Sequence, residues 1–449
     1  MPNPTEDGKN GQALGWDFGG DVLRALLYTR AMYAASPLSS GLTVLTAPTD
    51  GTASITAMVF VGAGSRYEEQ SERGISHFLE HMFFKGGKRY PTTRDVSGAI
   101  DSVGGSFNAF TGKEYAGYYV KVAAEQVELA CDVLGDMLLQ PAFPTEDIEK
   151  ERGVIIEEER MYQDTPMYRV GWDFEQLLYG DHPLGWDTIG TEEVIRSVTR
   201  EDFLQHKKRF YTPDNAVVVF AGKVTEEQAG TLAQRFFGSL AGKKQRVFSP
   251  LERFGEERVF LRTKKTEQAH LVLGVPGVSA LDDAYFAQRI LGVILGGNMS
   301  SRMFLNIRDA RGLCYYISTE VDNYLDAGAL STRAGVDQTR LFEAITAIRE
   351  EYVHCAEGGV TEEEVAKTKA YLKGGITLSL EDSEERAHFF GRQQLLYPKV
   401  RDIDEFFAAI DAVTKEDVDA LAKEILTPEA LRLVVIGQEK DEAKLRALL

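Results

Sequence analysis

Apolar and polar residues alternate along several short segments of this chain, in the pattern of half-buried β-strands. The clearest of these segments are residues 42–48, 55–62, 258–262 and 270–275. Other segments place their apolar residues three or four apart, which is the spacing of one helix face. One such helix runs through Val127, Ala130, Cys131, Leu134 and Leu138. The pattern therefore predicts a mixed α+β protein.

A long internal repeat divides the chain into two copies of one unit. Residues 198–222 and 413–437 align without a gap at an offset of 215, and both read V-T-[RK]-E-D, then T-P, then an apolar run that ends in glycine. Each segment predicts a helix capped by threonine, a proline-containing turn and a strand. A second echo, at an offset of 216, matches residues 144–150 with residues 360–366. We therefore expect an internal duplication of an α+β unit of roughly 200 residues.

The repeat also predicts the domain boundaries. Residues 1–38 are expected to be an N-terminal extension, residues 39–237 the first domain and residues 258–449 the second domain. Residues 238–257 would join the two domains, with the polar run Gly242-Lys243-Lys244-Gln245-Arg246 as the linker. A chain of 449 residues is too long for one hydrophobic core, which agrees with two domains.

Composition and charge narrow the class of protein. The net charge is −19, which argues against nucleic acid or an anionic membrane surface as a partner. No apolar run approaches the ~20 residues that a membrane span needs. The start of the chain lacks the layout of a secretory signal, and the three scattered cysteines indicate a reducing compartment. We therefore expect a cytoplasmic protein.

The segment with the most specific chemistry is the His-x-x-Glu-His sequence formed by His77, Glu80 and His81, inside an apolar helical run. Residues four apart lie on one face of an α-helix, so His77 and His81 can bind one Zn²⁺. Glu80 lies near the same face and can reach a water on the metal. Taken alone, this five-residue sequence is about equally consistent with a zinc site and with two buried histidines beside a glutamate present by chance. The choice between them depends on other segments of the chain.

Helical phase selects a third metal ligand among the acidic residues of segment 149–162. Taking Glu158 as zero, a stripe within roughly 60° of it contains Glu151 together with Val154, Ile155, Met161 and Tyr162. Glu157 and Glu159 lie about 100° to either side, and we expect Glu159 to be the more exposed of the two. Buried carboxylates are rare unless they are paired or bind metal. We therefore predict Glu158 as the ligand and Glu151 as the residue that orients a histidine, with a solvated acidic helix as the alternative.

The two copies differ at this site. Residues 280–300, where the motif would recur in the second copy, contain no histidine, and Glu158 aligns with Gly374. We therefore expect the first copy to bind the metal and the second copy to support the first without a metal site of its own. No metal ligand is expected among the other histidines, and His206 is predicted on an exposed helix; these histidines are His182, His206, His270, His354 and His388.

These residues resemble the M16 (pitrilysin-like, inverzincin) metallopeptidase family, whose pattern is H-x-x-E-H followed about 76 residues later by a glutamate. In this chain 76 residues separate His81 from Glu158, and Glu151 occupies the first position of the family's E-R-x-V-I-x-x-E segment. The resemblance extends from about residue 40 to the C-terminus, and a chain with two homologous halves is similar to the M16B branch, which includes processing peptidases. It implies two homologous α/β-sandwich domains, each an antiparallel-rich sheet covered by helices, that form half of a clamshell.

The same resemblance assigns two further segments to substrate handling. The family's N-A-x-T strand pairs with extended peptides, which implies that Asn108, Ala109 and Phe110 contact the substrate. A purely structural strand is the alternative. In the second copy, the family's R-(six residues)-Y element maps onto Arg308 and Tyr315, a guanidinium and a phenol that can hydrogen-bond the carbonyl under attack. Tyr316 is an adjacent rival for Tyr315.

The combined prediction is a zinc-dependent endopeptidase that cleaves unfolded or extended peptides inside a dimeric chamber. One Zn²⁺ per chain would be bound by His77, His81 and Glu158, with Glu80 as the base that activates a zinc-bound water. Because this chain carries both the zinc ligands and the Arg/Tyr pair, the resemblance implies a homodimer. The alternative is a non-catalytic or partner-dependent peptide-binding subunit of an M16-type heterodimer.

Overall fold

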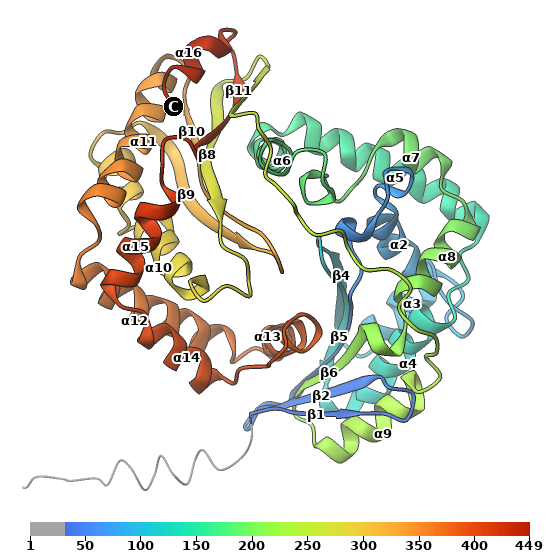
Figure 1. The fold of residues 1–449 in the computed structure, drawn as a ribbon. Coiled ribbons are helices and arrows are strands. Elements are labelled where there is room, and N and C mark those ends of the chain that lie inside the picture. Colours follow the sequence, from blue (N-terminus) through green and yellow to red (C-terminus); the bar gives the residue numbers. More distant parts are fainter. Residues whose placement is uncertain (1–31) are drawn as a thin grey trace, which may run out of the picture.

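The computed structural model describes residues 32–449, which form two halves of the same design on the two sides of a C-shaped body (Figure 1). Residues 1–31, most of the predicted extension 1–38, lie outside the described residues. The remainder of that extension contains strand β1 (Ala34–Pro37), which pairs antiparallel with the next strand of the chain. Residues 34–37 therefore belong to the first sheet.

The elements follow one another in nearly the same order in both halves, apart from short 3-10 turns. The first half contains β1, β2 (Thr43–Pro48), β3 (Ser54–Val61), α2 (Ile75–Phe83), α3 (Thr93–Asp101), β4 (Ser106–Thr111), β5 (Ala116–Ala123), α4 (Val127–Leu139), α5 (Thr145–Asp164), α6 (Pro166–Tyr179), α7 (Glu192–Ser197), α8 (Arg200–Phe210), β6 (Ala216–Gly222) and α9 (Glu226–Phe237). The second half contains β7 (Val259–Thr263), β8 (Gln268–Gly277), α10 (Tyr285–Gly296), the π-helical turn η6 (Phe304–Asp309), β9 (Cys314–Asn323), β10 (Gly328–Asp337), α11 (Leu341–Gly358), α12 (Glu362–Ser379), α13 (Ser383–Leu396), α14 (Ile403–Ala412), α15 (Lys415–Ile425), β11 (Arg432–Gly437) and α16 (Glu442–Arg446).

The two sheets share one topology. Their strand orders are β1-β2-β6-β3-β5-β4 and β7-β11-β8-β10-β9, so they differ only by the added β1. Among the described strands every neighbouring pair is antiparallel except β2–β6 and β7–β11, which are parallel in both halves. The repeated segments form α8 with β6 and α15 with β11, and the caps are Thr199 and Thr414 as predicted. The predicted fold of two homologous, antiparallel-rich units covered by helices is thus confirmed.

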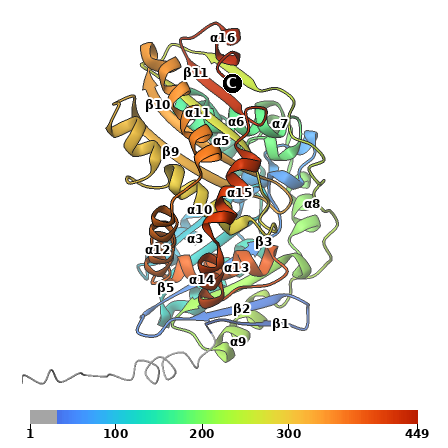
Figure 2. The same cartoon turned by 60° about the vertical axis from the view of Figure 1, so that its left-hand side comes forward.

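Each half also contributes one helix to the sheet of the other half. Helix α6 packs on β8 and β11 of the second sheet, and α13 packs on β3 and β6 of the first sheet. Both helices lie between the two sheets in Figure 1, and α13 stays beside the first sheet in the turned view (Figure 2). The exchange was not foreseen from the sequence, because periodicity identifies an apolar helix face without naming its partner.

The exchanged helices are held by large apolar side chains. On α6, Phe174 and Leu178 share a core with Val272 and Val434 of the second sheet. On α13, Phe390 is fully buried in a core with residues of β3 and β6 that include Phe60 and Val219. Gly391 allows this close approach, because a Cβ there would lie 2.3 Å from the Phe60 ring. Burial of one such side chain stabilises the folded chain by about 1.5–3 kcal/mol, so both cores stabilise the association of the two halves.

In the part of the chain that the structure describes, no helix combines the length and the apolar character needed to cross a membrane.

Candidate metal centre

Helix α2 positions the His-x-x-Glu-His residues. Its apolar side chains, among them Phe78 and Leu79, are fully buried, while His77, Glu80 and His81 lie on the partly exposed side. Gly74 starts the helix at a φ of 90°, and a Cβ there would lie 2.3 Å from the carbonyl oxygen of residue 189, so glycine is required. The sequence therefore fixes both the start of the helix and the face that its polar residues present.

A buried carboxylate also holds the first turn of α2. Glu68 is 4% exposed, and its oxygens accept the backbone N–H groups of Gly74 at 2.7 Å and Ser76 at 2.8 Å. These are N–H groups that a helix start leaves without an intrahelical partner. The sequence analysis did not single out Glu68, because it precedes the helix by several residues and is joined to it only by the fold.

The three predicted ligands converge in the structure. His77 Nε2 and His81 Nε2 lie 3.9 and 3.7 Å from Glu158 Oε2, and one ligand atom from each residue lies within 4.8 Å of the others. Within residues 32–449 this is the one group of three His, Cys, Asp or Glu side chains with such an arrangement. Helix α2 supplies the two imidazoles, and α5 supplies the carboxylate.

The donor set fits Zn²⁺. Zinc with bonds of about 2.0–2.1 Å in a tetrahedral site places its ligand atoms roughly 3.3 Å apart, so small side-chain rotations would close the observed distances. Burial lowers the pKa of His77 to about 3, and the nearby His81 adds to that effect. His77 is therefore neutral near pH 7, which is the state that binds a metal. Two imidazoles and one carboxylate leave a further coordination position free, as in catalytic zinc sites.

Glu151 contacts one histidine of the ligand group, His81. Glu151 Oε1 lies 3.0 Å from His81 Nδ1, which leaves Nε2 of the same ring directed toward Glu158. The other oxygen of Glu151 pairs with Lys85 Nζ at 2.5 Å. Burial raises the pKa of Glu151, but the hydrogen bonds from His81 and Lys85 outweigh it and hold that pKa below its ordinary value. Lys85 was missed, although its position four residues after His81 was a usable signal.

Glu80 lies beside the ligands and is held by a residue of another element. The Thr111 hydroxyl, at the end of β4, donates to Glu80 Oε2 at 2.5 Å. Burial raises the pKa of Glu80, with the Thr111 hydrogen bond and His81 opposing it. A raised pKa suits a carboxylate that has to accept and release a proton near neutral pH. The sequence named the strand of Thr111 but gave no sign of this contact.

Glu151 and Glu158 of α5 both lie beside the histidines of α2, but several of their neighbours are placed differently from the prediction. Val154 and Met161, predicted on the buried stripe, are 50% and 53% exposed, whereas Ile156 is 5% exposed. The buried face is centred on Ile148 and Ile155, which lie about 80° and about 60° from Glu158 at 100° per residue. Glu158 thus lies at the edge of this face, where a ligand can be both held and accessible. The order of the flanking acids is also reversed; they are Glu157, which is exposed, and Glu159, which is partly buried.

The predicted substrate strand β4 forms one edge of the first sheet. Asn108 is exposed, and its side-chain oxygen accepts the N–H of Ala109 at 2.9 Å. Phe110 turns its ring toward a cluster in which it contacts Tyr115 and His388 of the exchanged helix α13, at centroid distances of 5.8 and 5.3 Å. The edge position agrees with β-addition, while substrate contact by these residues stays a prediction.

Arg308 and Tyr315 lie before and at the start of β9, which is an edge strand of the second sheet. Arg308 is the penultimate residue of η6 and lies over the Phe304 ring, and Tyr315 is 75% exposed near the start of β9. Tyr316 points elsewhere, because its hydroxyl pairs with His270 Nδ1 at 2.9 Å. Of the two adjacent tyrosines, Tyr315 is therefore the one with a free side chain.

The predicted placement of His206 was wrong. His206 is fully buried rather than on an exposed helix face, and its Nε2 lies 3.3 Å from Ser76 Oγ on α2. The neighbouring lysines had suggested a solvated face. The face of α8 that carries His206 is instead covered by α2.

Two family models match consecutive parts of the chain. The model of the M16 peptidases, described as insulinase, matches residues 43–192, and that of the M16 inactive domain matches residues 197–372. The uncharacterized zinc protease YmxG of Bacillus subtilis is 35% identical over 382 residues, covering 85% of this chain and 93% of the relative. The chain belongs to the M16 peptidase family. The matches place the complete ligand group in the M16 domain and none of its residues in the inactive domain.

Further relatives of this M16 chain agree in name and in fold. The uncharacterized zinc protease ML0855 of Mycobacterium leprae is 37% identical, covering 87% of this chain and 88% of its own length. Among solved structures, a protease from Helicobacter pylori matches with a TM-score of 0.83 at 21% identity, covering 90% of this chain and 99% of that one. A peptidase M16 inactive domain from Pseudomonas fluorescens matches with a TM-score of 0.85 at 16% identity, covering 91% and 98%. At these identities the structures show a shared fold.

Proposed function

We propose that this M16 protein is a zinc-dependent endopeptidase that cleaves unfolded or extended peptides. The observation that carries the proposal is the convergence of His77, His81 and Glu158 within 4.8 Å, with a partly buried glutamate, Glu80, on the same helix. A structural zinc site would be closed by a fourth protein ligand. Here three ligands and a neighbouring carboxylate form the arrangement of a hydrolytic site.

The residues of the chain divide the chemical work. When bound, Zn²⁺ would polarise the scissile carbonyl and lower the pKa of the attacking water. Glu80 would accept the proton of that water and pass it to the leaving amine. Thr111 holds the Glu80 carboxylate in place, and Glu151 keeps His81 in the required tautomer. Because Glu80 is fixed before the reaction, little reorganisation is needed when the proton moves.

Substrate would be bound along the β4 edge at Asn108, Ala109 and Phe110. Main-chain hydrogen bonds to an edge strand recognise extended peptides with little regard to sequence. Arg308 and Tyr315 would donate hydrogen bonds to the carbonyl under attack, and their exposed side chains support this role. We also propose an M16B-type homodimer, in which the pair of one chain works opposite the zinc site of the other. A cytoplasmic location stays a prediction.

The decisive experiment joins metal analysis to peptide cleavage. The purified protein should contain one zinc per chain and cleave members of a mixed peptide pool. Glu80→Gln should keep its zinc and lose about 10²- to 10⁴-fold in kcat, because proton transfer contributes a factor of that size. Glu157→Gln, an exposed acid on α5, is the matched control and should cleave like wild type.

Two outcomes would contradict the proposal. A protein that binds no zinc when purified with zinc present would exclude the metal chemistry. A Glu80→Gln variant that cleaves as fast as wild type would exclude the assigned base. A zinc-loaded protein that binds peptides but cleaves none would support the alternative, a non-catalytic subunit.

A further inference from the structure

Two arginines from different helices line one small cavity of about 160 Å³ in the second half. They are Arg289 on α10 and Arg392 on the exchanged helix α13. Many arginines of this acidic chain pair with carboxylates, as Arg302 does with Glu364 at 2.7 Å. Within residues 32–449, neither cavity arginine makes an ion pair: Arg289 donates to the Tyr285 hydroxyl at 2.9 Å, and Arg392 lies over tyrosine rings.

Arg392 has an unused donor inside the fold. Its Nε is buried and has no hydrogen-bond partner among the described residues. Leaving a buried charged donor unpaired costs about 1–3 kcal/mol or more, which an anion bound beside it would recover. The cavity is also lined by Tyr285, Tyr397 and His388. Its one acidic lining residue, Glu385, is exposed and pairs with neither arginine.

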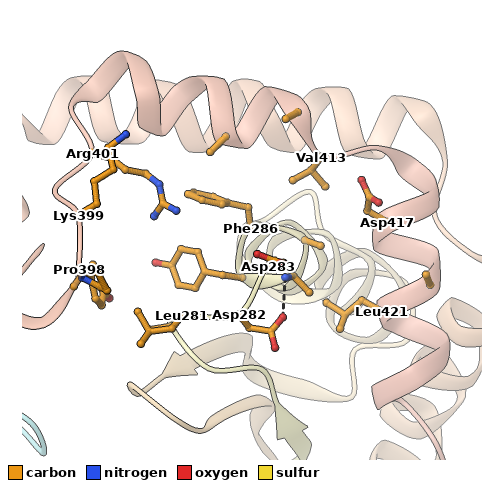
Figure 3. Close-up of a pocket in the computed structure, with 18 of the residues that line it drawn as sticks. Leu281, Asp282, Asp283, Phe286, Pro398, Lys399, Arg401, Val413, Asp417 and Leu421 are labelled. Atoms are coloured by element: carbon orange, nitrogen blue, oxygen red, sulfur yellow. Dashed lines mark hydrogen bonds between the residues drawn. The ribbon is translucent and has the colours of Figure 1, made fainter.

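A neighbouring cavity lacks this preference for anions. It has a volume of about 760 Å³ and shares Tyr285 and Tyr397 with the smaller one. Figure 3 shows Lys399 and Arg401 along one wall and Asp417 at the opposite end. With Asp282, Asp283 and Glu424 also in its lining, the two cations are outnumbered by acids. The larger cavity therefore lacks the excess of positive charge that the smaller cavity has.

Helix α13 connects this cavity to the proposed substrate strand. His388 on α13 contacts Phe110 of β4 at a centroid distance of 5.3 Å, and the next residue, Thr111, holds Glu80. Arg392 lies one helical turn after His388 and stacks over Tyr115, which follows β4 in the chain. The same helix thus contacts the substrate strand and carries the unpaired arginine.

We propose that the cavity formed by Arg289 and Arg392 binds a carboxylate of the peptide substrate. The ligand group is either an acidic side chain or the C-terminal carboxylate, and the planar guanidinium of Arg392 can bind it through two parallel hydrogen bonds. The inference rests on the proposed peptidase function and adds a preference for acidic peptides to it.

The test compares peptides that differ in one carboxylate. A neutral, amide-capped peptide that wild type cleaves is the parent; glutamate replaces glutamine at one position at a time, and one version has a free C-terminal carboxylate. We expect at least one acidic version to exceed the parent about tenfold in kcat/KM, through a lower KM. In Arg392→Gln and in Arg289→Gln, the ratio of kcat/KM for that acidic peptide to kcat/KM for the parent should fall to near one. The peptide version that is preferred shows whether the bound carboxylate belongs to an acidic side chain or to the C-terminus.

Controls separate charge, fork geometry and folding. Arg235→Gln removes an exposed arginine of α9 and should keep the wild-type ratio. Arg392→Lys should keep more of the preference than Arg392→Gln, because lysine has the positive charge but cannot donate two parallel hydrogen bonds to a carboxylate. An acidic preference that persists in both glutamine variants, or equal cleavage of every acidic version and the parent, would overturn the proposal.

Binding to Glu80→Gln, followed by fluorescence anisotropy with labelled acidic and neutral peptides, gives a readout that needs no cleavage. If wild type cleaves nothing while Arg392 still determines acidic binding, the peptidase function fails and the carboxylate site stands. If wild type cleaves peptides but Glu80→Gln binds acidic and neutral ones alike, the peptidase function stands and the site fails.

Discussion

The two halves of this chain use one scaffold for two purposes. In the first half, α2 packs against α5 and the contact holds two histidines and two glutamates. In the second half, α10 packs against α12, and α10 is apolar on nearly all sides, with Ile290, Leu291 and Leu295 fully buried. The residue aligned with Glu158 is Gly374, whose surroundings are open. The difference shows that the scaffold does not need the polar site and that the site depends on a few side chains.

The comparison also shows how the polar helix contact is kept. Three glutamates of the first half have partners from other elements: Glu68 accepts N–H groups at the start of α2, Lys85 pairs with Glu151, and Thr111 donates to Glu80. Partly buried polar groups are costly unless such partners exist. The second half avoids the cost by packing apolar residues at the same place.

The largest expected effect comes from making the first half resemble the second at its third ligand. Glu158→Gln should weaken zinc binding more than a hundredfold, because a neutral amide replaces a charged ligand. Zinc content after dialysis against a weak chelator is the measurement. Glu157→Gln, the adjacent and exposed acid, should keep its zinc; loss of zinc there and not at Glu158 would reverse the ligand assignment.

Substitutions on the two exchanged helices show whether α6 and α13 contribute equally to the free energy of unfolding. Phe174→Ala on α6 and Phe390→Ala on α13 should each lower the free energy of unfolding by about 3–5 kcal/mol, since each empties a buried ring site between the halves. Denaturant unfolding measures the loss. Phe260→Ala, at a ring 36% exposed, is the control and should lose less than about 1 kcal/mol. A small loss at only one exchanged helix would mean that one half depends less on the other.

A smaller effect should follow when the partner of His81 is altered. Glu151→Gln should weaken zinc binding about 10- to 100-fold, because the amide no longer stabilises the His81 N–H with a full charge. Competition with a chromogenic chelator gives the affinity. Lys85→Met should weaken it less, since Lys85 acts only through Glu151. A variant of Glu151 with wild-type affinity would show that His81 needs no such partner.

The smallest effect concerns the start of α2 and depends on pH. Burial raises the pKa of Glu68 to about 7, although the N–H groups of Ser76 and Gly74 oppose it. Between about pH 5 and 7 the folded state therefore keeps a proton that the unfolded state releases, so this group makes stability fall as pH rises. Glu68→Gln lacks the titration. Relative to that variant, wild type should lose roughly 1–3 kcal/mol across this window in denaturant unfolding, and a flat difference would contradict the shift.

Much of the fold and of the metal centre could be predicted from the sequence. The repeat predicted two equal units because both copies keep the same caps and turns, and the two histidines are neighbours on a single helix. Glu158 was selected by helical phase, and its distance from His81 along the chain agrees with the family pattern. Burial of His206 and exposure of Val154 could not be found in this way, since each depends on which element packs against which face. The exchange of α6 and α13 escaped prediction for the same reason.

That exchange has a mechanical consequence. Swinging the halves apart at residues 238–257 would pull Phe174 and Phe390 out of the opposite sheets and expose both apolar seams at once. The chain should therefore move as one rigid body, and in the proposed homodimer an opening that admits a peptide would have to come from motion of the two chains relative to one another. Spin labels placed one in each half should give a single narrow distance distribution, with and without peptide.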